Sequence, residues 1–295
     1  MKPLIYTSFA LTAFALNSIL CRLALRGDEA DAAGFTAVRL ASGAAALVLI
    51  RLLFGSPRVG SGEVGTSRVS FLTSGPLRHG SWLSALFLFA YAACFSFAYL
   101  GLEAGTGALI LFGSVQLTMI AVAILRGERP SAIELLGLAA AVGGLVYLVL
   151  PGLASPPLSS SLLMAASGAA WGGYTLRGRG SRDPLADTTA NFVRSLPMAA
   201  LLAVAFVPAI HLSPRGWLLA ALSGAVTSGL GYTVWYSALR YHTATRAAVL
   251  QLAVPLIAAA AGAVLLAEPA TMRLAVAALL ILGGIAAAIA GRRKS

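Results

Sequence analysis

The sequence predicts an all-α membrane protein of ten transmembrane helices, arranged as two inverted repeats of five helices each. Of its 295 residues, 59% are apolar and only 11% are charged, whereas soluble domains are about a quarter charged. Two long apolar runs, Thr106–Glu128 and Arg246–Glu268, lie one in each half of the chain. Each is long enough to cross the roughly 30 Å apolar core of a bilayer. The basic residues gather between the apolar runs, as they do in proteins that cross a membrane many times.

Ten apolar runs divide the chain, and each has about the 20 residues that a transmembrane helix needs. We expect helices over residues 4–25, 32–54, 82–101, 105–125, 132–150, 159–177, 186–208, 215–239, 244–267 and 271–290. The first run is longer than the apolar core of a cleavable signal peptide, and other runs follow it, so we interpret it as a helix. The connector over residues 55–80 is rich in Gly, Ser and Arg, and we expect it to be poorly ordered. The uncharged segment Pro151–Leu158 separates a first repeat, residues 1–152, from a second, residues 153–295.

The basic residues predict the orientation of the chain. Fifteen Lys and Arg residues lie at the chain ends and in the even-numbered connectors, three lie in the odd-numbered connectors and three lie within helices. Connectors rich in Lys and Arg stay in the cytoplasm, so both termini are expected there and the second repeat is inverted relative to the first. This distribution explains the net charge of +11 without a nucleic-acid partner. The expected partners are the lipid bilayer and a small-molecule solute.

Absent motifs argue against several function classes. The two lysines, Lys2 and Lys294, are terminal, so the chain has no Gly-Lys-Ser/Thr phosphate loop for ATP-driven pumping. Neither an HExxH zinc motif nor a Gly-x-Ser-x-Gly nucleophile motif is present. We interpret Asp183 and Asp187 as solvated loop residues rather than metal ligands. An intramembrane enzyme acting on lipid-borne substrates is an alternative without a recognisable catalytic constellation, so we expect no enzymatic activity, metal or cofactor.

Few charged residues lie within the expected helices. No carboxylate lies near the middle of one, which favours facilitated diffusion or exchange over tight proton coupling. Glu128 and Glu268 each end an apolar run close to a proline, and we interpret them as interfacial or gating residues. Arg39 and Arg194 occupy equivalent positions in the two repeats and form either an anion site or clamps between helix ends. Because both are off-centre and no lysine is internal, sugar-phosphate transport is disfavoured. Pro255 is expected to bend the ninth helix and free backbone groups for a solute.

Aromatic and amide side chains are the candidate solute ligands. On the third expected helix three of them recur every four residues and share one face. Trp171 alone among the tryptophans is expected at depth, since Trp82, Trp217 and Trp235 lie near helix ends. The candidate substrate-binding residues are Asn17, Tyr91, Phe95, Tyr99, Gln116, Trp171, Ser228, Tyr232 and Gln251. Each could instead hold helices together, but as a group around one cavity they would suit a neutral or zwitterionic, partly apolar solute.

Several of these residues resemble a known family, the EamA repeat of the drug/metabolite transporter superfamily. The second half carries the closer resemblance, through Trp171-Gly172, Arg194, Tyr236-Ser237-Ala238-Leu239, Pro255, Ala267-Glu268-Pro269 and Gly283-Gly284. In the first half, Arg39 and Gly127-Glu128 match the repeat. There Phe14-Ala15 replaces Trp-Gly, and Val115 or Gln116 stands where the proline would be.

Within the superfamily the chain looks most like the YddG-type exporters of aromatic and other amino acids. The resemblance implies ten helices, residence in the bacterial inner membrane and a central cavity lined mainly by helices 1, 3, 4, 6, 8 and 9. It also implies export of amino acids and related small metabolites, which we expect to proceed by alternating access in a monomer. A multidrug or cation exporter of the same superfamily is the alternative, and it would be expected to carry a deep carboxylate, which the sequence lacks.

Overall fold

The computed structural model describes residues 2–54, 79–127, 130–152, 155–178, 181, 183–239, 241–242 and 250–291. Within these residues the fold is helical, and one isolated β-bridge joins Ala30 to Leu212. The main helices are α1 (Lys2–Arg26), α2 (Ala32–Phe54), α4 (Trp82–Ala98), α5 (Ala104–Leu125), α6 (Ala132–Val149), α7 (Leu158–Gly178), α8 (Pro184–Ala205), α9 (Pro214–Leu222), the π-helix η3 (Ser223–Leu230), α10 (Gly231–Leu239), α12 (Ala253–Leu266) and α13 (Met272–Gly291). Among the described residues, seven helical segments are long and apolar enough to cross a membrane, and α4 and α12 are shorter apolar helices.

The expected all-helical fold is confirmed, and the described residues form a helix at each of the ten expected positions. The eighth is one continuous run made of α9, η3 and α10. The ninth differs most from its expected bounds, because α12 begins at Ala253 after a turn at Leu252. Proline lacks an N–H group and its ring collides with the preceding turn, so Pro255 interrupts the helix at this point. Residues 244–249 of this expected helix lie outside the described residues.

Local sequence explains where several helices begin. The side chains of Ser81, Ser131, Asp183 and Ser213 each accept a hydrogen bond from the backbone amide three residues further on. Such a capping oxygen satisfies one of the N–H groups that the first turn of a helix leaves without a partner. These caps place the starts of α4, α6, α8 and α9 within two residues of the positions that the apolar runs predict.

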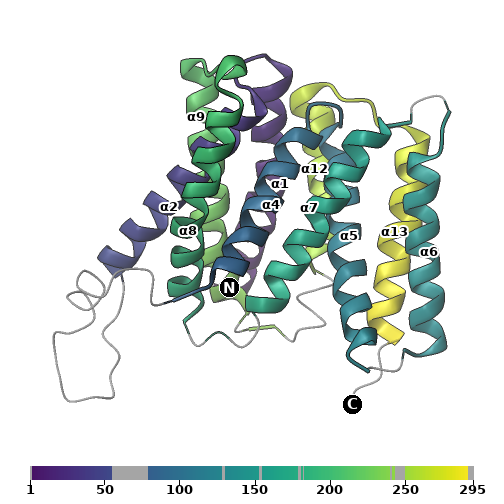
Figure 1. Cartoon of the computed structure of the whole chain (residues 1–295). Helices are drawn as coiled ribbons and strands as arrows, with labels where there is room; N and C mark the ends of the chain where they lie inside the picture. The colour runs from purple at the N-terminus through teal and green to yellow at the C-terminus, as the bar shows by residue number, and fades with distance from the viewer. Residues whose placement is uncertain are drawn as a thin grey trace, which may run out of the picture.

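The helices pack in pairs that run across the two halves of the chain. Extensive contacts join α6 to α13, α4 to α7, α2 to α8 and α5 to α12, while α1 packs on η3 and α10. Figure 1 shows α2 and α8 on one side of the molecule and α6 and α13 on the other. Counted in chain order, with α9, η3 and α10 as the eighth helix, these are the pairs 5–10, 3–6, 2–7, 4–9 and 1–8. Exchanging helices 1–5 with helices 6–10 gives the same five pairs. It is the pattern expected of inverted repeats, although their boundary between residues 152 and 153 stays a prediction.

Both chain ends lie at the same end of the bundle. In Figure 1, α1 begins and α13 ends toward the lower end, where α2 also ends and α8 begins. Arg51 and Arg177, in the last turns of α2 and α7, lie there as well. We call this the basic end and the other the opposite end.

Glycines allow α6 and α13 to approach closely. A Cβ atom on Gly284 would lie 2.5 Å from the carbonyl oxygen of Gly137 and 2.8 Å from the amide nitrogen of Ala141. A Cβ atom on Gly137 would in turn lie 2.4 Å from the carbonyl oxygen of Gly284. Small residues at such crossings let two backbones pack against each other, which drives association where lipid replaces water.

We expect Gly284→Ala to destabilise the protein by about 1–3 kcal/mol, because the added methyl group must push the two backbones apart. Gly283→Ala is the matched control, since a Cβ atom there meets nothing within 4 Å. Thermal unfolding of both variants in detergent measures the effect. Equal melting temperatures for the two variants would show that the close approach is not needed.

Candidate functional site

A cavity lies between α1, α4, α5, α7, the η3–α10 run and the short helical stretch before α12. These are the first, third, fourth, sixth, eighth and ninth of the ten membrane helices, the six that the family resemblance implies. About 410 Å³ of empty space lies between the lining side chains, but little of it is wide enough for a water molecule. The cavity is therefore narrow.

Trp171 of α7 is the centre of an aromatic cluster in this cavity. Its ring lies 5.0 Å from the ring of Tyr232 and 5.3 Å from that of Tyr174, stacked on both, and 4.8 Å from the ring of Tyr91. Phe14 of α1 also packs on Tyr232, with 5.8 Å between ring centroids. Four helices thus contribute rings to one cluster, which offers π faces to a planar or apolar group.

Asn17 of α1 joins three helices on the polar side of the cavity. Its Nδ2 donates to the hydroxyl of Tyr91 at 3.3 Å, and its Oδ1 accepts from the hydroxyls of Ser223 at 2.6 Å and Thr227 at 3.1 Å. The π-helical turn of η3 places both hydroxyls toward α1, and Thr227 and Ser228 also bond to the carbonyl oxygen of Ser223. The cavity therefore has an aromatic side and a hydrogen-bonding side.

Arg39 of α2 lies directly behind this polar side. It is only 1% exposed, and its Nη2 donates to the Tyr91 hydroxyl at 2.9 Å. Its guanidinium carbon lies 4.8 Å from the ring centre of Phe95 and 5.1 Å from that of Tyr91, within the range of cation–π attraction. Gly224 of η3 makes room for α2 here, since a Cβ atom at that position would lie 2.1 Å from the carbonyl oxygen of Arg39.

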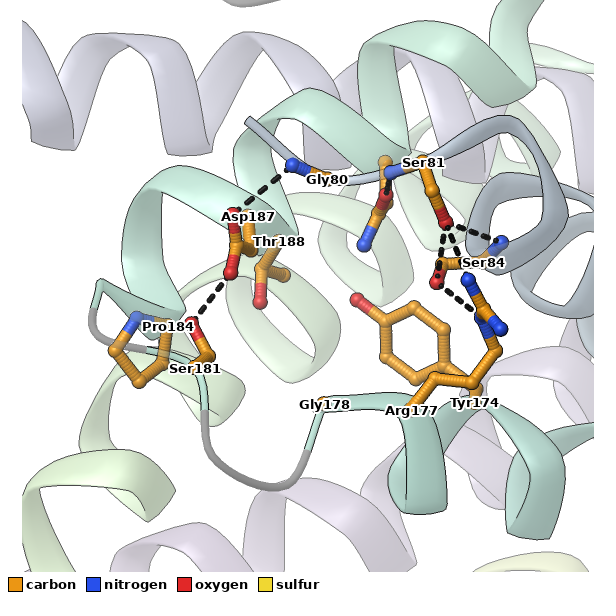
Figure 2. A pocket seen from close by; sticks show the side chains of 11 residues that line it. Gly80, Ser81, Ser84, Tyr174, Arg177, Gly178, Ser181, Pro184, Asp187 and Thr188 are labelled. Carbon is orange, nitrogen blue, oxygen red and sulfur yellow. Dashed lines mark hydrogen bonds between the residues drawn. The ribbon is translucent and has the colours of Figure 1, made fainter. Parts of the chain in front are cut away.

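A second, polar pocket opens at the basic end, between the start of α4, the end of α7 and the start of α8 (Figure 2). It contains about 620 Å³ of space. Arg177 donates to the hydroxyls of Ser84 at 3.0 Å and Ser81 at 3.1 Å, while Asp187 accepts from the amide of Gly80 at 2.9 Å. Tyr174 lines this pocket and stacks on Trp171, so two rings separate the pocket from the central cavity.

An ion pair closes the opposite end. Nε of Arg22 lies 3.0 Å from Oε1 of Glu268, and Oε2 of Glu268 accepts from the amide of Ala104 at 2.8 Å. Arg22 also donates to the carbonyl oxygen of Tyr99 at 3.0 Å, and the Tyr99 hydroxyl donates to the carbonyl oxygen of Ala104. These contacts tie α1, the end of α4, the start of α5 and the segment after α12 into one closed layer.

Glu103 lies beside this layer, at the N-terminus of α5. Burial raises the pKa of its carboxyl group and the nearby charge of Glu268 raises it further, while Arg22 and Arg26 act in the other direction. Glu103 therefore binds a proton more readily than an exposed glutamate does.

Comparison with known proteins decides the family. A model described as the EamA-like transporter family matches residues 158–290. A protein of Pseudomonas aeruginosa, the uncharacterized protein PA1977, is 50% identical over 291 residues, which are 99% of this chain and 96% of that protein. The chain belongs to the EamA-like transporter family. It is a multi-pass membrane transporter of small molecules.

A protein of known crystal structure shares the fold of this EamA-like transporter. It is 20% identical, with a TM-score of 0.64 and coverage of 99% of both chains. At this level of identity the likeness concerns the fold alone.

Six of the nine candidate substrate-binding residues line the central cavity. They are Asn17, Tyr91, Phe95, Trp171, Tyr232 and Gln251. Tyr99, Gln116 and Ser228 are buried outside the lining. Tyr99 packs edge-on against Phe95 at 4.7 Å and belongs to the closed layer at the opposite end, while the Ser228 hydroxyl bonds to its own helix.

The residues expected to have structural or gating roles separate into different places. Glu268 takes part in the closed layer, and Pro255 lies in the first turn of α12. Arg39 lies behind the cavity, whereas Arg194 donates to the carbonyl oxygen of His79 and lies 5.9 Å over the ring of Trp82, near the basic end. Their equivalent sequence positions therefore do not give equivalent surroundings. Glu128 lies outside the described residues.

The expectation that Trp235 occupies the membrane interface is wrong. Trp82 and Trp217 are 59% and 55% exposed, as interfacial tryptophans are, but Trp235 is only 7% exposed. It packs edge-on against Phe14 at 5.9 Å and supports the aromatic cluster from behind. The contact comes from α1, far away in the sequence, so the position of Trp235 in its own helix did not predict it.

Sequence reasoning missed four residues of the cavity lining, which are Phe14, Leu111, Phe112 and Thr227. The repeat held a signal for Phe14, because it stands where the second half has Trp171, and both rings pack on Tyr232. Leu111 and Phe112 gave no signal, since they lie in an apolar run without a distinct face.

We expect Glu268→Gln to destabilise the protein by about 1.5–3 kcal/mol, because it leaves the charge of Arg22 without its partner. The double variant Arg22→Gln/Glu268→Gln should lose less than the sum of the two single variants. Thermal unfolding of all three in detergent checks this. Arg215→Gln is the control, since Arg215 meets Glu29 at 3.5 Å on the exposed surface, where ion pairs contribute little. Additive losses would contradict the coupling.

Proposed function

We propose that this EamA-like transporter exports amino acids with aromatic or other neutral side chains, and related small metabolites, across the bacterial inner membrane. The observation that carries the proposal is the cavity around Trp171. One side of it offers stacked rings from Tyr91, Tyr232 and Phe14, and the other offers the amide and hydroxyl groups around Asn17. An amino acid has the same two parts, an apolar side chain and a polar α-carbon end. The resemblance to YddG-type exporters supports the same solute class.

The transport step in this proposal is alternating access by rocking of the two halves around the cavity. The positive-inside distribution supports a cytoplasmic location for the basic end, and in this orientation a solute would enter through the pocket beside Tyr174. It would leave at the opposite end, after the layer around Arg22 and Glu268 opens. We expect the transporter to work as a monomer. No carboxylate belongs to the described lining, which favours exchange or facilitated diffusion over tight proton coupling.

Export of organic cations is a second candidate function. Stacked tyrosine and tryptophan faces attract cations, and the cluster around Trp171 offers several such faces. The described lining has no carboxylate to neutralise a bound cation, and this favours amino acids.

Counterflow into proteoliposomes tests the proposal. The full chain is reconstituted, the vesicles are loaded with one unlabelled amino acid at a time, and entry of the same labelled amino acid is followed with and without a pH gradient. We expect entry of aromatic and large neutral amino acids that is insensitive to the gradient. Entry of labelled tetraphenylphosphonium without entry of any amino acid would favour the second candidate.

We expect Trp171→Ala to lower counterflow of phenylalanine about tenfold or more, because removing one stacked ring removes about 1–3 kcal/mol of contact with an aromatic solute. Trp217→Ala is the matched control, because this exposed ring of α9 lies outside the cavity lining. Equal rates for Trp171→Ala and the wild type, at equal amounts of folded protein, would move the solute site elsewhere.

A further inference from the structure

The polar side of the central cavity rests on a buried positive charge without a counter-charge. Arg39 is almost completely buried, and among the described residues no carboxylate forms an ion pair with it. Its Nη1 atom is buried without a hydrogen-bond partner in the same part of the chain. A charge removed from water is costly unless it is paired, so this environment is electrostatically incomplete. A ligand that brings negative charge close to Arg39 would complete it.

Hydrogen bonds connect Arg39 to side chains that line the cavity. The Tyr91 oxygen accepts from Nη2 of Arg39 and from Nδ2 of Asn17, which uses both of its lone pairs. Asn17 is held in this orientation because its Oδ1 accepts from Ser223. Tyr91 is left with only its own O–H to donate.

The O–H group without an acceptor belongs to a side chain that lines the cavity. Tyr91 and Tyr232 both line the cavity. The Tyr91 oxygen already accepts two hydrogen bonds, and among the hydrogen bonds of the described residues its own O–H has no acceptor. One phenolic O–H is therefore available to a solute, and the charge of Arg39 behind Tyr91 makes this group a stronger donor.

We propose that Arg39, acting through Tyr91, makes this transporter select solutes that carry a carboxylate. This inference rests on the proposed function. It gives the solute one orientation, in which the carboxylate faces Tyr91 and Tyr232 and the apolar part lies against Trp171. The same positive charge disfavours a cationic solute that lacks a carboxylate. Arg39 is a positioning residue here, since Tyr91 stands between it and the cavity.

The test compares matched solutes that differ only at the carboxyl group. Counterflow and ligand-induced shifts in melting temperature are measured with phenylalanine and phenylalaninamide, and with 3-phenylpropionate and 3-phenylpropionamide. We expect the wild-type protein to prefer each acid to its amide by about tenfold or more, which is the usual effect of one hydrogen bond to a charged group.

Variants then assign the preference to the Arg39–Tyr91 pair. Arg39→Gln should lose most of the preference, whereas Arg39→Lys should keep part of it because the charge remains. Tyr91→Phe should also lose it, while its ring can still pack on Trp171. Arg215→Gln removes an exposed arginine at the opposite end and should leave the preference unchanged. A merely structural role for Arg39 would lower the rates for acid and amide together and leave their ratio intact.

The outcomes separate this inference from the proposed function. If neither amino compound is transported but 3-phenylpropionate is preferred to its amide, the amino-acid proposal fails and the inference stands. If the wild-type protein treats acids and amides alike, the inference is wrong even where amino acids are transported. The inference is also overturned if Tyr91→Phe keeps the wild-type preference for acids. This variant tests the inference even if Arg39→Gln does not fold.

Discussion

The structure depends on one constraint, which is that a polar group inside a bilayer has no water to bond and must find its partner within the protein. Helices meet this demand for the backbone. For the side chains it is met by a few interhelical contacts, of which the bonds of Asn17 to Tyr91 and Ser223 are the clearest, because they join α1 to α4 and η3. Asn17 and Tyr91 also line the cavity. Helix association and solute contact are therefore not alternatives here. The polar groups that hydrogen-bond the helices to one another are also polar groups of the cavity between those helices.

The same constraint explains why the two ends of the molecule differ. At the opposite end, Arg22 and Glu268 neutralise each other and tie four segments together, so opening this end requires breaking a mostly buried ion pair. At the basic end, Arg177 meets only the hydroxyls of Ser81 and Ser84 among the hydrogen bonds of the described residues, around an open pocket. The basic end has charged contacts too, between Arg51 and Asp183 at 3.7 Å and between His79 and Asp187 at 3.6 Å, but these side chains are more exposed than Arg22 and Glu268 and lie beside a pocket.

Sequence reasoning predicted the fold well because membrane helices follow from length and composition alone. Capping residues such as Ser131 and Asp183 then fix the starts within two residues. Most residues of the candidate site could also be named from the sequence, since aromatic and amide side chains deep in a membrane helix tend to face other helices or a cavity rather than lipid. The parts that were missed depend on contacts between distant segments or on irregular backbone. The packing of Trp235 on Phe14 is of the first kind, and the π-helix that turns Ser223 and Thr227 toward Asn17 is of the second, because a π-helix shifts the phase of every later residue.

Duplication explains the architecture, but the differences between the copies explain the site. Phe14 and Trp171 hold corresponding positions, and both pack on Tyr232, yet only one of them carries an indole. Arg39 and Arg194 correspond as well, yet only Arg39 lies behind the cavity, while Arg194 lies near the basic end. A cavity with true two-fold symmetry would accept an asymmetric solute equally well in two opposite directions. Divergence has left the ring cluster on one side and the positive charge on the other, so the two orientations of a solute with one apolar and one charged end differ in energy. In the proposed mechanism an inverted repeat thus supplies two alternately opening gates, and the loss of its symmetry at two pairs of equivalent residues supplies a preferred orientation for the solute between them.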